Sequence, residues 1–389
     1  MSMTMLTILQ IAQALSAYTL VTLILPGIML HKHLAEYKMS ERLIGYFLAG
    51  NFYIIYLVFL LQFLHISHPI TLQIGTIFPA FFIIWKKRKS LHIISKVSNF
   101  FQMTIHILRK EIGLKTLISK GWKKFNRKYS RGIKQWLKRY LPDILLTAAI
   151  ITGVFYVYGI NTATVYGYKA SDIPVHNLWV NEMDNNNIFA NGVYPYGFHC
   201  IIYYLHAVFQ IDSYVLMCLF SLVQTIAIHL VLLAFLRLCC KNRYVSYAVV
   251  LVYILGNFLQ PSTYLRFFAV LPQEYGMLFI LPSAYFAFRF FAARKREIQG
   301  KKTRLSSAWC LTFFAMSFGM TLAVHFYDTM IAGLFCVGIA LGYIGWFVRG
   351  KYFWRVVLAC FLGVFSAVLP MAAAFISGTP LQGSLGWGM

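Results

Sequence analysis

Long apolar stretches alternate with shorter polar segments along most of this 389-residue chain. Most of the apolar stretches reach or approach about 20 residues, the length that an α-helix needs to cross a bilayer. The pattern therefore predicts an all-α, polytopic membrane protein with about ten transmembrane helices. The expected spans are residues 7–30, 43–64, 70–85, 143–158, 213–236, 245–258, 275–290, 305–323, 327–347 and 353–375.

One long polar interruption, at residues 167–212, is rich in acids rather than bases. Residues 198–210 within it are apolar, but about thirteen residues are too few to span a bilayer. We therefore expect a first outer loop at residues 160–212 that carries an interfacial helix. Asp212 stands just before the next span and is expected to cap that helix at its N-terminus.

Basic residues are concentrated on one side of the expected membrane. Residues 86–140 hold 17 Lys and Arg and a single acid, Glu111, a bias that favours the cytoplasmic side. Apolar residues recur between these cations at helical spacing, which predicts amphipathic helices on an anionic leaflet. With the N-terminus outside, this order leaves only Lys169 and Arg266 of the 35 Lys and Arg residues on the outer face. Threading residues 198–210 through the membrane would invert every later loop.

Composition agrees with an integral protein of the cell membrane. Apolar residues make up 59% of the chain and charged residues 12%, far from the average of soluble domains. The net charge of +24 suggests nucleic acid, but the bases lie in loops between spans, so we expect membrane lipids and no nucleic acid as partners. We divide the chain into an N-terminal three-span segment (1–85), a basic cytoplasmic amphipathic segment (86–141) and a transmembrane core (142–389).

The seven cysteines show no CxxC spacing and lie mostly in apolar segments. This pattern predicts buried thiols, not a disulfide framework or a zinc site. A weaker metal-type spacing occurs at Glu182 and Asp184, two carboxylates two residues apart, so a divalent cation is a candidate cofactor there.

The acidic loop also holds residue types that carry out acid–base chemistry. Asp172 and His176 are spaced i, i+4 just beyond a span, at a boundary between polar and apolar sequence. A carboxylate or an imidazole in such a place can act as a general base. The plain alternative is that these side chains only solvate the loop.

Four more ionisable residues stand near the ends of later spans. Arg266 and Glu274 precede and open one span, and His325 and Asp328 open another. A charge at such a position costs free energy unless it is paired or hydrated. These residues are therefore either parts of a site or ordinary helix-end residues.

A turn signal, Tyr194-Pro195-Tyr196-Gly197, leads into the expected interfacial helix, which starts at residue 198 and has His199 in its first turn. An outward span, an early loop acid (Asp172), this turn and an inward span ending in the bases of residues 237–243 form one arrangement. It resembles the GT-C class of membrane glycosyltransferases, which use polyprenyl-phosphate-linked sugars. The resemblance covers the layout of residues 142–389.

The resemblance implies an inverting transfer of a sugar, on the outer face, from a lipid-phosphate donor to a glycan, lipid or protein hydroxyl. Asp172 is then the expected base, and His176 orients it or the acceptor. Arg266 would hold the phosphate, with Lys169 as second choice. The other residues expected to bind substrate are Glu274, Tyr194, His199, His325 and Asp328.

Two other functions are compatible with the sequence. One is a transporter or flippase of lipid-linked glycan, although the expected spans hold almost no ionisable residue at mid-depth other than His229. The other is a non-catalytic subunit of a membrane assembly. Met389 lies a few residues into an expected outer loop, so we also expect this chain to be part of a longer protein.

Overall fold

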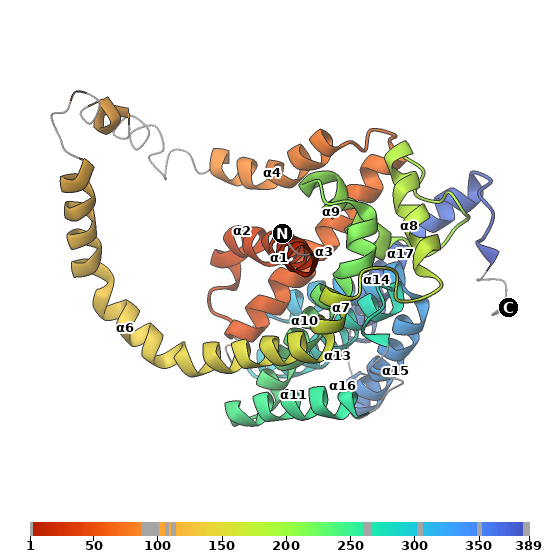
Figure 1. Ribbon diagram of the computed structural model, residues 1–389. Helices are drawn as coiled ribbons and strands as arrows, with labels where there is room; N and C mark the ends of the chain where they lie inside the picture. The colour runs from red at the N-terminus through yellow and green to blue at the C-terminus, as the bar shows by residue number, and fades with distance from the viewer. Residues whose placement is uncertain are drawn as a thin grey trace. The chain divides into compact units, whose positions relative to one another are not determined.

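The computed structural model describes residues 3–86, 101–105, 109, 114–259, 266–301, 306–347 and 352–383 (Figure 1). No β-strand occurs among these residues, apart from an isolated parallel bridge between Val193 and Leu381. The predicted all-α class is confirmed. In chain order the helices are α1 (Met3–Thr19), the π-helix η1 (Leu20–Ile24), α2 (Leu25–Leu34), α3 (Met39–Phe63), α4 (Pro69–Lys86), α6 (Leu114–Val154), the π-helix η2 (Phe155–Gly159), α7 (Ile160–Thr164), α8 (Ile173–Glu182), the 3-10 helix η3 (Met183–Asn185), α9 (Gly197–Phe209), α10 (Ser213–Cys239), α11 (Arg243–Phe258), α13 (Pro272–Ile298), α14 (Ser307–Val324), α15 (Phe326–Gly342), α16 (Ile344–Phe347) and α17 (Tyr352–Ile376).

Seven helical stretches of the described chain are long and apolar enough to cross a membrane. They are Thr4–Leu34, Met39–Phe63, Leu137–Thr164, Ser213–Cys239, Pro272–Ile298, Ser307–Val324 and Trp354–Ile376. Each coincides with an expected span. The other three expected spans form shorter apolar helices, Pro69–Ile83, Arg243–Phe258 and Phe326–Gly342. An integral membrane protein is the class that these helices indicate, while the count of ten is not confirmed.

The chain divides into two compact units, one of Met1–Thr76 with Thr152–Met389 and one of Ile77–Ile151. The smaller unit contains most of α6, a helix of 41 residues that runs from the basic segment into an apolar span. Lys123, Lys134 and Lys138 are exposed on it. Much of the basic segment, residues 87–100 and 110–113 included, lies outside the described residues.

Helices from both ends of the sequence share the core of the larger unit. Tyr18 of α1 and Tyr275 of α13 place their hydroxyl oxygens 2.8 Å apart, and both lie within hydrogen-bond distance of Asn51 Oδ1 on α3. All three side chains are buried, and a fully partnered polar network holds helices in one arrangement because its partners cannot be replaced by water. The first two spans therefore belong to the same core as the helices after residue 152.

A close helix contact depends on one glycine in α3. A Cβ atom on Gly50 would lie 2.6 Å from the Cα atom of Thr22 in η1, closer than any real side chain allows. The π-helical turn widens the backbone at this point. Glycine thus lets α3 pack directly on the backbone of the first span.

The segments that we expect on the outer side meet at one end of the larger unit. Gln62 Nε2, at the end of α3, donates to the Met183 carbonyl at 2.7 Å, and the Ser67 amide donates to Asn186 Oδ1 at 2.7 Å. The Val193 amide donates to the Pro380 carbonyl at 2.8 Å, which ties the acidic loop to the segment after α17.

The segments that we expect in the cytoplasm meet at the opposite end. Glu41 near the start of α3 accepts from Tyr285 Oη at 2.7 Å and lies 3.4 Å from an Arg289 guanidinium nitrogen, both on α13. Glu297 at the end of α13 accepts from the amide and the hydroxyl of Ser307 at the start of α14, both at 2.8 Å. The grouping of the loops at two ends agrees with the expected alternation of the spans.

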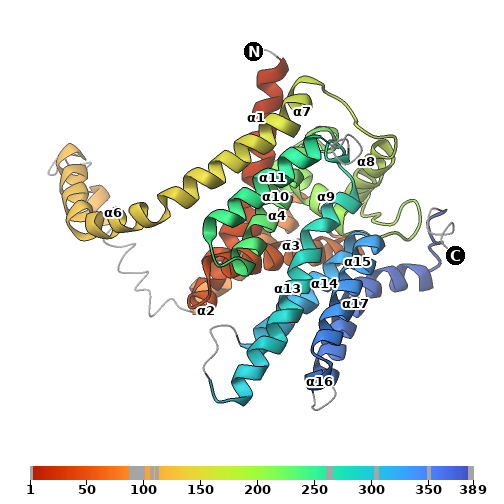
Figure 2. The same ribbon diagram turned by 90° about the horizontal axis from the view of Figure 1, so that it is seen from below.

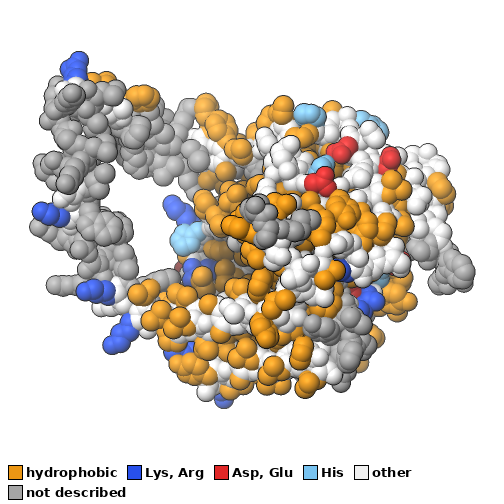
Figure 3. All heavy atoms as spheres, viewed as in Figure 1, with side chains coloured by type: hydrophobic (Ala, Val, Ile, Leu, Met, Phe, Trp, Pro, Cys, Tyr) orange, Lys and Arg blue, Asp and Glu red, His pale blue; other side chains and the backbone are white. Residues whose placement is uncertain are grey.

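The packing of α13, α14 and α17 accounts for most of the second half of the unit. These helices run alongside one another, with α14 between the other two (Figure 2). Large apolar side chains remain exposed on α15 and α17, among them Leu334, Trp354 and Ile376. Figure 3 shows hydrophobic side chains over most of the face in view, with acids and histidines gathered over α8 and α9.

The short helix expected at residues 198–210 is present as α9, but its surroundings differ from an interfacial position. Nearly every side chain of α9 is buried, and the helix packs against α3, α8, α10 and α14. Its apolar sequence is therefore explained by protein neighbours on all sides, not by one face turned to lipid. Asp212 does cap the next helix, since its Oδ1 accepts from the amides of Tyr214 and Val215.

Candidate functional site

The candidate site begins with α8, the first helix of the acidic loop. Asp172 occupies the N-cap position and proline stands in the first turn, where its missing N–H costs nothing. The His176 amide donates to the Asp172 carbonyl at 3.2 Å, so the two residues lie one helical turn apart, as their spacing predicts. The Asp172 side chain is exposed and accepts a hydrogen bond from Ser171 Oγ at 3.2 Å.

The His176 ring points to α9, where it meets a second imidazole. His176 Nδ1 and His199 Nε2 are 3.0 Å apart, and both residues are buried. Burial lowers the pKa of His176 to about 4, although the charge of Asp172 acts in the opposite direction. Burial, with His176 beside it, holds the pKa of His199 well below its usual range. Both imidazoles are therefore neutral at neutral pH.

Aromatic rings enclose this histidine pair. The ring centroids of Trp179, Tyr194 and Phe198 lie 5.0, 6.2 and 6.3 Å from that of His176. Tyr194 belongs to the turn before α9, and burial raises the pKa of its hydroxyl. Packed rings of this kind fix the orientation of an imidazole without competing for its nitrogen atoms.

Gly197 explains why the turn signal ends in glycine. A Cβ atom at this position would lie 3.0 Å from the Ala323 carbonyl oxygen near the end of α14. The glycine therefore serves a close approach between α9 and α14, and not a left-handed backbone. This contact brings the acidic loop next to the junction of α14 and α15, where His325 lies.

Arg266 forms the cationic part of the site. Its Nε atom donates to Glu274 Oε1 at 2.5 Å, and its Nη2 atom donates to Gln273 Oε1 at 2.8 Å. The Arg266 side chain is 54% exposed, whereas that of Glu274 is 4% exposed. The carboxylate thus holds the guanidinium from the buried side, and the exposed side can contact an anion.

Asp328 and His325 complete the cluster. Asp328 Oδ2 is 3.9 Å from His325 Nδ1. A Cβ atom on Gly276 would lie only 2.0 Å from Asp328 Oδ2, so this carboxyl group sits against the first turns of α13, beside Glu274. Burial lowers the pKa of His325 to about 4, and the nearby charge of Arg266 adds to the effect.

These groups remain incompletely paired. Glu274 Oε2, His325 Nδ1 and Asp328 Oδ2 are buried and have no hydrogen-bond partner within the part of the chain that the structure describes. Buried polar atoms without partners are uncommon, and a catalytic role is one of the explanations for them. The structure therefore brings together most of the residues predicted for a site: Asp172, His176, Tyr194, His199, Arg266, Glu274, His325 and Asp328.

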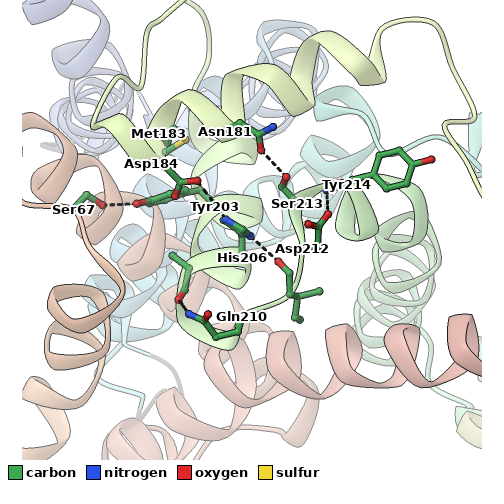
Figure 4. A network of polar contacts seen from close by, with 12 residues as sticks. Ser67, Asn181, Met183, Asp184, Tyr203, His206, Gln210, Asp212, Ser213 and Tyr214 are labelled. Carbon is green, nitrogen blue, oxygen red and sulfur yellow. Dashed lines mark hydrogen bonds and ion pairs between the residues drawn. The ribbon is translucent and has the colours of Figure 1, made fainter.

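Lys169, Glu182 and Asp184 take no part in this cluster. Lys169 Nζ donates to the Val165 carbonyl, and partial burial lowers its pKa. Asp184 Oδ2 lies 3.5 Å from His206 Nε2 (Figure 4). No group of three or more His, Cys, Asp and Glu side chains could hold a metal ion in the described ranges. A cation at Glu182 and Asp184 stays a prediction.

The sequence pattern does not indicate the residues that hold the acidic loop in place. His206 Nδ1 donates to the Ile211 carbonyl at 2.8 Å, and Ser213 Oγ donates to Asn181 Oδ1 at 2.6 Å (Figure 4). Gln62 reaches Met183 across 121 positions of sequence. No local pattern indicates such partners, because each pair is chosen by the fold.

Comparison of the chain with models of protein families finds no match. Neither curated proteins nor solved structures match it.

Proposed function

We propose that this protein is an inverting glycosyltransferase that moves a sugar from a lipid-phosphate donor to a hydroxyl acceptor. One observation carries the proposal: the acid–base residues of α8 and the guanidinium of Arg266 converge on the same end of the larger unit. The link between them is the junction of α14 and α15: Gly197 of α9 packs on the Ala323 carbonyl, and His325 lies 3.9 Å from Asp328, which packs on α13.

The chemistry of such a transfer needs few groups from the protein. A lipid phosphate is already a good leaving group, so the site must remove a proton from the acceptor and stabilise the negative charge that develops. Asp172 and His176 are the proposed acid–base pair. Arg266 is the proposed phosphate ligand, since the exposed side of its guanidinium carries N–H groups that do not bond to Glu274.

The proposal places this end of the protein on the outer face of the cell membrane, with the N-terminus on the same side. The lipid donor lies in the bilayer, and the exposed apolar side chains of the larger unit can contact its chain. Membrane lipids and a lipid-linked sugar are then the partners, and a glycan, lipid or protein hydroxyl is the acceptor.

The test is transfer by the 389-residue chain in lipid nanodiscs, with polyprenyl-phosphate-linked sugars as donors. Arg266→Ala should lose about 2–4 kcal/mol of transition-state stabilisation, by analogy with removal of one oxyanion donor. Arg266→Lys should lose less, because it keeps the charge but not the bidentate fork. Asp172→Asn should reduce transfer while donor binding is kept.

Matched controls separate these effects from general damage to the loop. Asp212→Asn also removes a loop carboxylate, but asparagine caps a helix as well as aspartate does. Lys241→Ala removes an exposed cation at the other end of α10. Both controls should keep the transfer rate. Equal rates in Asp172→Asn, Arg266→Ala and the wild type would refute this site, and movement of an intact lipid-linked glycan across vesicles without transfer would favour a flippase.

A further inference from the structure

The hydrogen bonds of His199 determine which of its nitrogens carries the proton. His199 bonds to the backbone of Pro195. Proline has no N–H group, so the partner is a carbonyl oxygen, which can only accept. His199 therefore donates to Pro195 with one nitrogen. Because His199 Nε2 faces His176, the donating atom is Nδ1 and Nε2 keeps its lone pair.

The tautomer of His176 follows from that of His199. The two nitrogens are 3.0 Å apart, and His199 Nε2 can only accept, so His176 Nδ1 must donate. In a neutral imidazole the second nitrogen then has no proton. His176 Nε2 consequently carries a lone pair, and the side-chain hydrogen bond that His176 makes within the described residues uses Nδ1 and not Nε2.

We infer that His176 Nε2 is the atom that accepts the proton of the attacking hydroxyl, and that His199 is a positioning residue that holds His176 in the required tautomer. This inference rests on the proposed function. It also changes the role of Asp172, whose carboxylate, one helical turn before His176, stabilises the imidazolium that forms.

In the proposed step, the acceptor hydroxyl gives its proton to His176 Nε2, and its oxygen forms a bond to the anomeric carbon of the donor sugar. The bond between that carbon and the phosphate oxygen breaks, and its electron pair leaves with the lipid phosphate beside Arg266. The imidazolium then releases the proton to water, which restores the neutral pair.

His176 is unprotonated at neutral pH, so its lone pair is available to the acceptor hydroxyl. With a pKa of about 4 it is as basic as an ordinary aspartate, yet its neutral form needs no counter-ion in a buried place. The titratable groups that face it are Asp172 on α8, His199 on α9, Tyr194 in the turn and His325 at the junction of α14 and α15. Asp172 favours the protonated form, whereas His325 opposes it when charged.

The tautomers can be measured without any substrate. In ¹⁵N NMR spectra of the histidine-labelled chain in nanodiscs at neutral pH, His176 should show a protonated Nδ1 and an unprotonated Nε2. Its signals are assigned by their loss in His176→Gln. In His199→Leu, which removes the acceptor, the preference for this tautomer should disappear. In His199→Gln, which keeps an acceptor near the position of Nε2, it should persist.

Transfer kinetics then test the role of the lone pair. Loss of a general base typically costs about 10²–10⁴-fold in rate, and we expect losses of this size in His176→Asn and His176→Gln. The amide of glutamine can accept a hydrogen bond but not a proton, so a wild-type rate in His176→Gln would overturn the inference. His199→Leu should lose rate and His199→Gln should recover most of it. His33→Gln, an exposed histidine at the other end of the unit, is the control.

The outcomes separate this inference from the proposed function. A wild-type rate of sugar transfer in the His176 variants would refute the role of His176 but not the proposed function. Absence of transfer with every donor would refute the function, while the NMR spectra would still decide the tautomer. A proton on His176 Nε2, or histidine signals that change on addition of EDTA and so reveal a bound metal, would overturn the inference itself.

Discussion

Three histidines of the candidate site make folding stability depend on pH. The pKa values of His176 and His325 are lowered to about 4 from an ordinary value of 6.5, and burial also holds the pKa of His199 well below 6.5. Because the unfolded chain protonates these histidines at a higher pH than the folded chain does, their contribution to folding stability is full above about pH 6.5 and falls as the pH drops toward 4.

The measurement is the thermal unfolding temperature of the purified protein between about pH 7.5 and pH 4. His176→Gln and His199→Gln should each show a shallower decline than the wild type, because each removes one titrating group. A decline of the same steepness in both variants would show that other groups cause it.

Gly276 provides a second prediction at the residue scale. Alanine here would place its Cβ atom 2.0 Å from Asp328 Oδ2, so the carboxyl group must move away from α13. Overpacking of this kind typically costs about 1–3 kcal/mol. Gly333→Ala on α15 is the matched control, since a Cβ atom there meets nothing within 4 Å. Unfolding temperatures of the two variants should differ, with Gly276→Ala the lower.

The residues of the site were foreseeable from sequence because ionisable groups are rare in this chain. Asp172, Arg266 and Asp328 stand out against apolar surroundings, and a charge there requires a partner. Which partner each would find was not foreseeable. The pairing of His176 with His199 joins positions 23 residues apart, and that of Glu274 with Arg266 needs a chain reversal. Both follow from tertiary packing.

Among the elements, α14 and α17 depend on paired glycines. A Cβ atom on Gly319 would lie 2.6 Å from the Gly363 carbonyl oxygen, and one on Gly363 would lie 2.7 Å from the Ala315 carbonyl oxygen. Small residues let membrane helices approach closely and gain van der Waals contact. The two backbones therefore touch along this face.

Alanine at either position should force the two helices apart. We expect a loss of about 1–3 kcal/mol from Gly319→Ala or Gly363→Ala, and less than the sum from the double variant, because one separation relieves both contacts. Unfolding in graded denaturing detergent provides the measurement. Gly338→Ala, where a Cβ atom has open space, should be neutral or stabilising. Strict additivity in the double variant would argue against a shared contact.

The sequence predicts where helices occur more reliably than it predicts how long each helix is. The pattern of apolar residues located all ten stretches, since apolar runs in this chain are helical throughout the described residues. It located the end of α11 at Phe258, but it could not show that the span expected at residues 327–347 is divided, with α15 ending at Gly342 and α16 covering Ile344–Phe347. The two helices α11 and α15 have 16 and 17 residues, and the backbone amides of their C-cap residues, Leu259 and Tyr343, bond back to carbonyls of the last turn.

At the scale of the whole molecule, the predicted sidedness can be tested by labelling. Single cysteines at Lys123 and Asn187, both exposed, should react with an impermeant maleimide from opposite sides of intact cells, because the basic segment is expected inside and the acidic loop outside. The background should lack the seven native cysteines, which are all free thiols. Labelling of both positions from the same side would contradict the predicted topology of ten spans.

The contacts between the acidic loop and its neighbours also bear on the order in which the protein matures. The Val193 carbonyl accepts from the Gln382 amide at 3.2 Å, and its amide donates to Pro380. These partners leave the ribosome almost 190 residues after Val193 does, once α17 has been made. A nascent chain that ends at residue 376 contains α8 and α9 but lacks the partners of Val193. A chain that includes residue 382 can form both hydrogen bonds to Val193. The acidic loop is thus tied to the segment after α17 only once that segment has been made. Stalled chains of the two lengths should differ in protease cleavage at residues 187–193, the shorter one being cut faster.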